Sequence, residues 1–158
     1  MQVLHAEAAE EVLARETGFA ERLGGLLQAW VDVAEPYHAF AGKFFKNAAA
    51  PTSPLSPFST ESEPARRASI ALFARVLDGS DLKLAPALRS ELPELLWLLH
   101  MGVVLFWVHD RSEGQRRTRM LVGRVAPLVD KLARLTRLPV VRGVVNDLVD
   151  LLADLRKS

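Results

Sequence analysis

Histidines are the residues most able to do chemistry in this chain of 158 residues, because it contains no cysteine. They are His5, His38, His100 and His109, and none forms a His-x-x-x-His pair on a predicted helix. His100 and His109 lie nine residues apart, or about 13.5 Å along a helix, so they cannot share an ion. The sequence therefore predicts no metal site, no cofactor and no thiol catalysis.

Other catalytic and phosphate-binding patterns are missing as well. Gly24 and Gly25 fall within a predicted helix and are followed by two leucines, which is unlike a phosphate-binding loop. The chain has no Gly-x-Ser-x-Gly turn, and nothing in the spacing assembles serine, histidine and acidic residues into a catalytic group. These residues give no support to an enzyme, and we predict no catalytic residues.

Aromatic side chains with a few polar groups among them are the remaining candidates for a binding site. One sector of a very apolar helix carries Trp97, His100, Met101, Val104 and Trp107, and a kinked helix carries Trp30, Tyr37, His38, Phe40 and Phe44. Where the two helices face each other, an apolar pocket with convergent polar tips is a natural ligand site. The alternative is that these residues form ordinary hydrophobic core, in which the buried histidine bonds to a backbone carbonyl. The spacing alone favours this alternative.

The elements that position these residues are all helices. We expect helices over 3–16, over 60–78 after a capping box at Thr60 and Glu63, over 86–110, over 115–137 and over 139–156. An apolar stripe from Phe19 to Phe44 predicts one long helix, kinked near Val33–Pro36. Three prolines in 50–59 favour an extended connector, with Leu55 and Phe58 packed on the domain. No segment is typical of a strand.

The segment 95–108 is the most apolar part of the chain. It has 14 residues, whereas a membrane span needs about 20, so we expect a helix buried on nearly every side. Pro93 is expected in its first turn.

The last two helices carry more apolar surface than one core requires. Joined by a short turn at Leu138–Pro139, they predict an antiparallel hairpin whose spare face a second copy covers. The residues that we expect at this dimer interface are Leu121, Val125, Leu128, Leu132, Val141, Val145, Leu148 and Leu152.

The net charge of +1 conceals an uneven distribution. Residues 1–35 hold seven acidic residues and two arginines, a net −5, whereas residues 111–137 hold eight basic and two acidic residues, a net +6. The basic stretch could contact phosphates, but without a nucleic-acid motif we favour a solvated helix face with ion pairs to an acidic helix. Acidic residues near the N-terminus are unlike a secretory signal, and we expect a cytoplasmic protein.

The helix order and several strings resemble the C-terminal effector-binding and dimerisation domain of TetR-family transcriptional regulators, in an actinobacterial branch. The strings are Tyr37-His38-Ala39-Phe40-Ala41, Pro54-Leu55-Ser56-Pro57-Phe58, Leu95-Leu96-Trp97-Leu98 and Gly102-Val103-Val104-Leu105-Phe106-Trp107. The resemblance covers nearly the whole chain. It implies one all-helical domain over 1–158 with about six helices, which dimerises through the last two.

The resemblance also implies a function. A small apolar or amphipathic effector would bind between the kinked helix and the apolar helix, and would shift the leading helix, which carries DNA-binding heads. A helix-turn-helix would precede residue 3 in such a regulator and is not in this sequence, so this chain would reach DNA only through a separate N-terminal head. The alternative is a helical protein–protein interaction module without a small-molecule site.

Overall fold

The computed structural model describes residues 2–48, 53 and 56–157, and it contains no strand within those ranges. The α-helices are α1 (Gln2–Arg15), α2 (Phe19–Ala34), α3 (His38–Ala48), α4 (Glu63–Asp78), α5 (Pro86–His109), α6 (Arg116–Leu135) and α7 (Pro139–Lys157). Two 3-10 turns, η1 (Glu35–Tyr37) and η2 (Glu113–Gln115), connect α2 to α3 and α5 to α6. The all-helical fold class is therefore confirmed.

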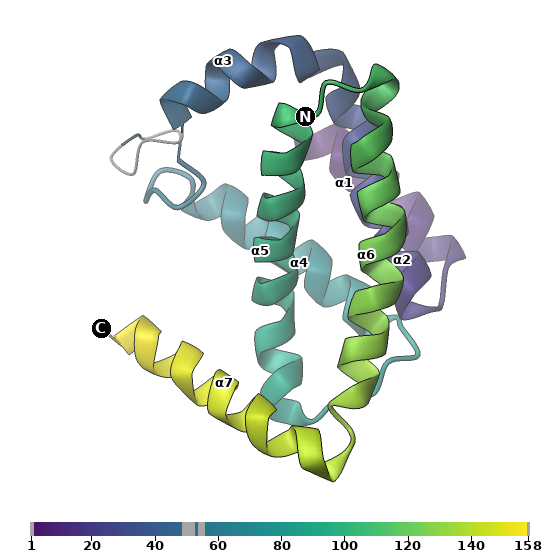
Figure 1. The fold of residues 1–158 in the computed structure, drawn as a ribbon, viewed down its shortest axis with the longest axis vertical. Helices are drawn as coiled ribbons and strands as arrows, with labels where there is room; N and C mark the ends of the chain where they lie inside the picture. The colour runs from purple at the N-terminus through teal and green to yellow at the C-terminus, as the bar shows by residue number, and fades with distance from the viewer. Residues whose placement is uncertain (1, 49–52, 54–55, 158) are drawn as a thin grey trace.

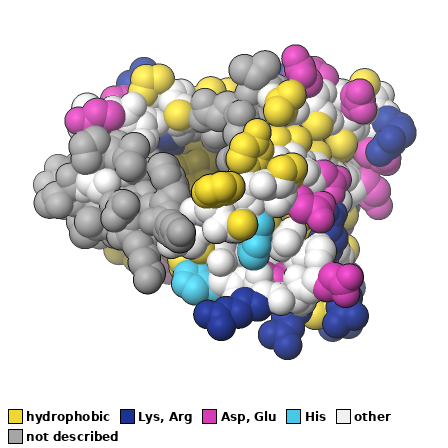
Figure 2. All heavy atoms as spheres, turned by 90° about the horizontal axis from the view of Figure 1, so that it is seen from above, with side chains coloured by type: hydrophobic (Ala, Val, Ile, Leu, Met, Phe, Trp, Pro, Cys, Tyr) yellow, Lys and Arg dark blue, Asp and Glu magenta, His cyan; other side chains and the backbone are white. Residues whose placement is uncertain are grey.

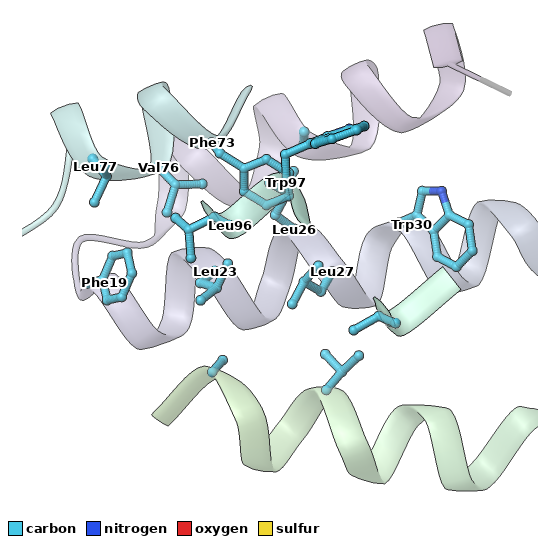
Figure 3. Packing of buried hydrophobic residues seen from close by; sticks show 14 of the residues in the cluster. Phe19, Leu23, Leu26, Leu27, Trp30, Phe73, Val76, Leu77, Leu96 and Trp97 are labelled. Carbon is cyan, nitrogen blue, oxygen red and sulfur yellow. The ribbon is translucent and has the colours of Figure 1, made fainter. Parts of the chain in front are cut away.

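The helices form two layers around a shared core. Figure 1 shows α5 and α6 side by side in front of α1, α2 and α4, with α3 across one end and α7 leaving the other. The front and back layers meet where α6 packs along α2 and where α4 packs against α5. Fully buried side chains of α2, including Leu23, Leu26 and Leu27, form the centre of this core (Figure 3).

Small residues allow α2 and α6 to approach closely. A Cβ added at Gly24 would lie 3.3 Å from the Cβ of Ala126, so the glycine sets how near α6 can come. The side of α6 that faces α2 holds Thr118, Val122, Ala126 and Ala133, all buried. The predicted stripe of Leu121, Leu128 and Leu132 lies off this buried side, and Leu128 and Leu132 are about half exposed. The prediction of surplus apolar surface on α6 is confirmed.

The long helix expected over 19–44 is instead two helices. The first helix, α2, ends at Ala34 and Pro36 lies in η1, so the chain is interrupted where a kink was expected, near Val33–Pro36. A 3-10 turn has 3.0 residues per turn rather than 3.6, so three residues shift the helical phase by about 60°. As a result Ala41 and Phe45 of α3 pack against the core, whereas Phe40 is 73% exposed.

Other sequence-based expectations need smaller corrections. Thr60 does not cap α4; the residue before the helix is Ser62, whose amide donates to the Ser59 hydroxyl. Pro93 lies inside α5 because that helix begins at Pro86. On α1 the buried side chains include His5, Ala9 and Val12, whereas Leu4 is half exposed. The connector residues 50–52, 54 and 55 lie outside the described residues.

The helix α5 is less enclosed than its composition predicts. Leu98, Leu105 and Phe106 are 41–52% exposed, so one face of this helix is open in the single chain. By length and composition alone α5 could cross a membrane, since its most apolar stretch has a mean hydropathy of 1.5. In the structure, 39% of that stretch is buried. Here it is the central helix, in contact with α3, α4, α6 and α7.

The antiparallel hairpin expected for α6 and α7 is wrong for the single chain. After the turn at 136–138, α7 points away from α6 and touches the domain mainly through α5 (Figure 1). Val144, Leu148 and Leu151 of α7 are 48–69% exposed. Within the described residues, the stripe that would have closed the hairpin therefore stays largely uncovered.

The buried arginine Arg22 fastens α1, α2 and α4 together. Its Nε donates to the carbonyl of Val76 at 3.0 Å, its Nη2 to that of Arg75 at 2.8 Å, and its Nη1 to those of Leu13 and Glu16 at 2.8 and 2.7 Å. These carbonyls lie at or just beyond the C-terminal turns of α1 and α4, where backbone acceptors lack helical partners and a positive charge is favourable. Burial lowers the pKa of Arg22, but the guanidinium group remains charged.

We predict that Arg22→Met lowers the free energy of unfolding by about 3 kcal/mol, because it leaves several partly buried carbonyls without a donor. Urea unfolding followed by circular dichroism measures this difference. Arg15→Met is the matched control, since Arg15 is exposed and pairs with its neighbour Glu16. Equal destabilisation by the two variants would contradict the role of Arg22.

Candidate functional site

A row of aromatic rings runs through the interior between α2 and α5. Trp30 of α2 lies between two residues of α5, with ring centroids 5.1 Å from His100 and 5.2 Å from Trp107, both in edge-to-face contact. Phe73 of α4 and His5 of α1 approach the His100 ring at 5.8 and 6.1 Å. Four helices therefore contribute a ring to one cluster, which we call the ring cluster: His5, Trp30, Phe73, His100 and Trp107.

His100 is the most unusual member of the ring cluster. It is 5% exposed, and neither Nδ1 nor Nε2 has a hydrogen-bond partner in the described part of the chain. Burial, with a smaller contribution from His5, lowers the pKa of His100 to about 3, so the ring is neutral at physiological pH. A neutral imidazole offers one donor and one acceptor, and leaving both unpaired in an apolar interior costs free energy.

The polar atoms of the neighbouring rings are only partly satisfied. The buried Nε1 of Trp107 also lacks a partner within the described ranges. The backbone carbonyl of Trp107 accepts a hydrogen bond of 2.8 Å from Nε2 of His38, whose ring lies 4.8 Å from the Trp107 indole. His5 donates from Nε2 to the carbonyl of Leu26 at 3.2 Å, and burial lowers its pKa despite this bond. Unpaired donors and acceptors thus concentrate at His100 and Trp107.

The structure brings together some of the predicted ligand-binding residues and separates others. Trp30, Trp97, His100 and Val104 are buried in the core, and Met101 is half-buried beside it. His38 lies at the edge of the ring cluster through its bond to Trp107. Tyr37 and Phe40 are 48% and 73% exposed, so the expectation that they line the interior is wrong, because η1 turns them outward. The side chain of Phe44 lies outside the described residues.

Sequence reasoning left two members of the ring cluster, His5 and Phe73, out of the candidate binding site. Trp107 was among the candidates because it is seven residues after His100 and so on the same side of α5. His5 and Phe73 come from other helices, and their approach to His100 follows from how α1 and α4 pack. Periodicity within one helix carries no such information.

A groove between α4 and α5 lies close to the ring cluster. It has a volume of about 160 Å³ and is lined by Pro57, Ser62, Ala65, Arg66, Ser69, Trp97 and Met101. Phe58, from the segment before α4, lies edge-on to Trp97 with ring centroids 5.4 Å apart. Figure 2 shows a hollow with hydrophobic side chains at its floor, next to residues that are not described.

The charged residues of the described ranges pair with one another at the surface. Arg119 of α6 bonds to Asp32 of α2 and to Glu35 of η1, and Arg134 bonds to Asp81 and Asp130. These contacts confirm ion pairs between the basic stretch and acidic residues of its neighbours.

Glu35 and His38 have a spacing that can bind a metal, but the structure directs them to different partners. Within the described residues, no three histidine or acidic side chains lie close enough to hold an ion.

Comparison with known proteins identifies the class of the fold. Residues 22–155 match the family model of the tetracyclin repressor-like C-terminal domain. The match includes α3 to α7 and most of α2, so the chain belongs to this family. No curated protein matches the chain at a significant level. Domains of this family are regulatory rather than enzymatic, and in general they bind small-molecule effectors and dimerise.

We predict that His100 makes the protein less stable in acid. Its pKa is lowered in the folded state and ordinary in the unfolded state, so the unfolded chain binds the proton more readily as the pH falls below about 6.5. The free energy of unfolding should therefore fall by about 2 kcal/mol between pH 6.5 and 5 on account of this residue, with a smaller loss from His5.

Urea unfolding of the wild type and of His100→Phe across this pH range measures the effect. The variant should lose most of the pH dependence, whereas His109→Phe should keep it, because His109 is an exposed histidine of the same helix. Parallel pH profiles for all three proteins would show that His100 does not titrate as described.

Proposed function

We propose that this chain is the effector-sensing and dimerisation domain of a TetR-like cytoplasmic transcriptional regulator, one domain over 1–158. The effector site is the interior between α2 and α5, around Trp30, His100 and Val104, with His38 at its edge. The observation that carries this proposal is the unpaired, buried His100. Folded proteins satisfy nearly all buried polar groups, and an exception calls for an explanation such as a missing ligand.

The proposal also assigns a role to α1. In a regulator of this family, effector binding is coupled to DNA binding by an N-terminal head, and we propose that α1 connects the sensing site to such a head. Support comes from His5, which places an α1 side chain against the His100 ring. An effector that changes the surroundings of His100 therefore acts directly on a residue of α1. Because the coupling is thermodynamic, DNA binding would weaken effector binding by the same factor.

The exposed apolar faces of α6 and α7 support the proposed dimer. Leu128, Leu132 and Leu148 are 48–54% exposed, and Leu121, Val125, Val141 and Val145 are partly buried. Leu152 was also predicted at this interface, but its side chain lies outside the described residues. A two-fold partner that presents the same helices would cover this surface, as expected for an isologous interface. A helical interaction module that binds a different protein is the alternative, and it is favoured by the close packing of Trp97 and His100, 3% and 5% exposed, and by the exposed apolar residues Leu105 and Phe106 of α5.

A thermal-shift screen of small apolar and amphipathic compounds tests the sensing function. At 100 times its dissociation constant, an effector should stabilise the domain by about 2.7 kcal/mol, or raise the Tm by roughly 5–10 °C. Val104→Phe should reduce this shift because Val104 is buried on the interior side of α5, whereas Leu105→Phe, at an exposed neighbour, should not. A broad screen without a stabilising compound, or equal effects of the two variants, would contradict the proposed site.

Sedimentation analysis tests the dimer. The wild-type chain of 17.5 kDa should sediment with the mass of two chains, and Leu148→Arg should yield monomers or aggregates, since a charge cannot be buried unpaired in an apolar interface. Met120→Arg is the control, because Met120 is as exposed as these leucines but lies outside the predicted interface. A monomeric wild type would exclude the proposed dimer.

A further inference from the structure

We propose that the groove between α4 and α5 is the route by which a ligand reaches the ring cluster. The ligand is a small uncharged molecule, about the size of one aromatic ring, that hydrogen-bonds to His100. This inference rests on the proposed sensing function and adds to it the route of access and the chemical class of the ligand. It differs from the expectation that the site lies only between α2 and α5. Four features of the structure support it.

The groove is aligned with the ring cluster on both of its walls. On α4, Ser62, Ala65 and Ser69 line the groove, and Phe73, one turn beyond Ser69, contacts the His100 ring. On α5, Trp97 and Met101 line the groove, and His100 lies in the same sector of that helix. The same two helices therefore border the groove and contribute Phe73 and His100 to the ring cluster.

The walls near the opening consist of residues that leave space or adapt. Ser62, Ala65 and Ser69 are small, and Met101 has a flexible side chain that can change conformation to admit a molecule. The rim is held in place, because Nη1 of Arg66 donates to the carbonyls of Pro57 and Ser59 at 2.9 and 3.2 Å. A fixed rim above an adaptable wall suits an opening rather than a plain packing defect.

The volume of the groove and the charges around it define the class of ligand. About 160 Å³ is similar to cavities that hold a single benzene ring. Among the described residues that line the groove, only Arg66 is charged, and its Nη1 is engaged with backbone carbonyls. His100 is neutral, and His5, which faces it from α1, also has a lowered pKa. Beyond the rim, a charged group placed against the neutral rings of His100 and His5 would lose its hydration without gaining a counter-charge from them, so an uncharged ligand is favoured.

The unpaired nitrogens of His100 determine which polar group the ligand carries. The ring can donate one hydrogen bond and accept one, so a hydroxyl group, which also does both, satisfies either tautomer. An apolar ring without a hydroxyl would fill the groove and leave His100 unpaired. We therefore expect phenol-like molecules to bind more tightly than hydrocarbons of the same shape.

Three probes of nearly equal shape test this inference: p-cresol, toluene and 4-methylbenzoate. Binding to the full chain is measured by ligand-observed NMR and calorimetry. We expect p-cresol to bind at least about tenfold more tightly than toluene, which corresponds to one net hydrogen bond, and 4-methylbenzoate not to bind. His100→Phe should bring the affinities for p-cresol and toluene to the same value, whereas His109→Phe should leave the preference unchanged.

A second pair of variants tests the route. Ser69→Trp fills the groove from α4 and should abolish binding of p-cresol, whereas Ser90→Trp, at an exposed position of α5, should not. Circular dichroism and the Tm without ligand establish that both variants are folded. If p-cresol binds Ser69→Trp normally, or if toluene or the benzoate binds best, the inference is overturned while the proposed sensing function stands. If none of the probes binds but other compounds stabilise the domain in the screen, the ligand class is wrong.

Discussion

The structure depends on how the chain buries α5, the most hydrophobic helix. It has 24 residues with few charges, and its apolar side chains point in every direction around its axis. A helix of that kind has to be covered on several sides, and α3, α4, α6 and α7 each take one part. The covering is incomplete, since Leu98, Leu105 and Phe106 remain partly exposed in the single chain. This shortage of cover, together with the open faces of α6 and α7, gives the fold a physical reason to associate with a second copy.

The same helix carries the polar group that the core does not satisfy. A phenylalanine at position 100 would pack among Trp30, Phe73 and Trp107 without the free-energy cost of burying an unpaired imidazole. A histidine that stays neutral, with a pKa of about 3, contributes no ion pair and no internal hydrogen bond within the described structure. Such a residue stabilises the domain only when something else supplies the missing partner. A ligand with a matching polar group is the simplest such partner, so His100 is the residue that connects this fold to sensing.

Sequence patterns predicted most of the helices because several carry a clear apolar period, as α6 does, or a stop signal, as with Gly79 after α4. The surplus stripe on α6 was also predictable, since Leu128 and Leu132 repeat on a side distinct from Val122 and Ala126. The direction in which Phe40 points was not, because η1 changes the helical phase and no single-helix pattern contains that change. The approach of His5 to His100 depends on the packing of α1, and the divergence of α7 depends on a turn of a few residues whose geometry the composition leaves open.

The helix α1 is bound to the domain in two different ways, and the difference bears on signalling. At its C-terminal end, Arg22 bonds to the carbonyls of Leu13 and Glu16, and through Arg75 and Val76 it joins that end firmly to α4. Near its N-terminal end, His5 contacts the interior through one bond to the Leu26 carbonyl and through the His100 ring. A ligand at His100 would therefore act on the less firmly held end of α1 while Arg22 keeps the other end in place. A helix held at one end and displaced at the other pivots, so a small change at the ring cluster becomes a larger movement at the start of α1. In the proposed regulator that start is where a DNA-binding head connects, and a pivot favoured by ligand and disfavoured by DNA is all that reciprocal coupling requires.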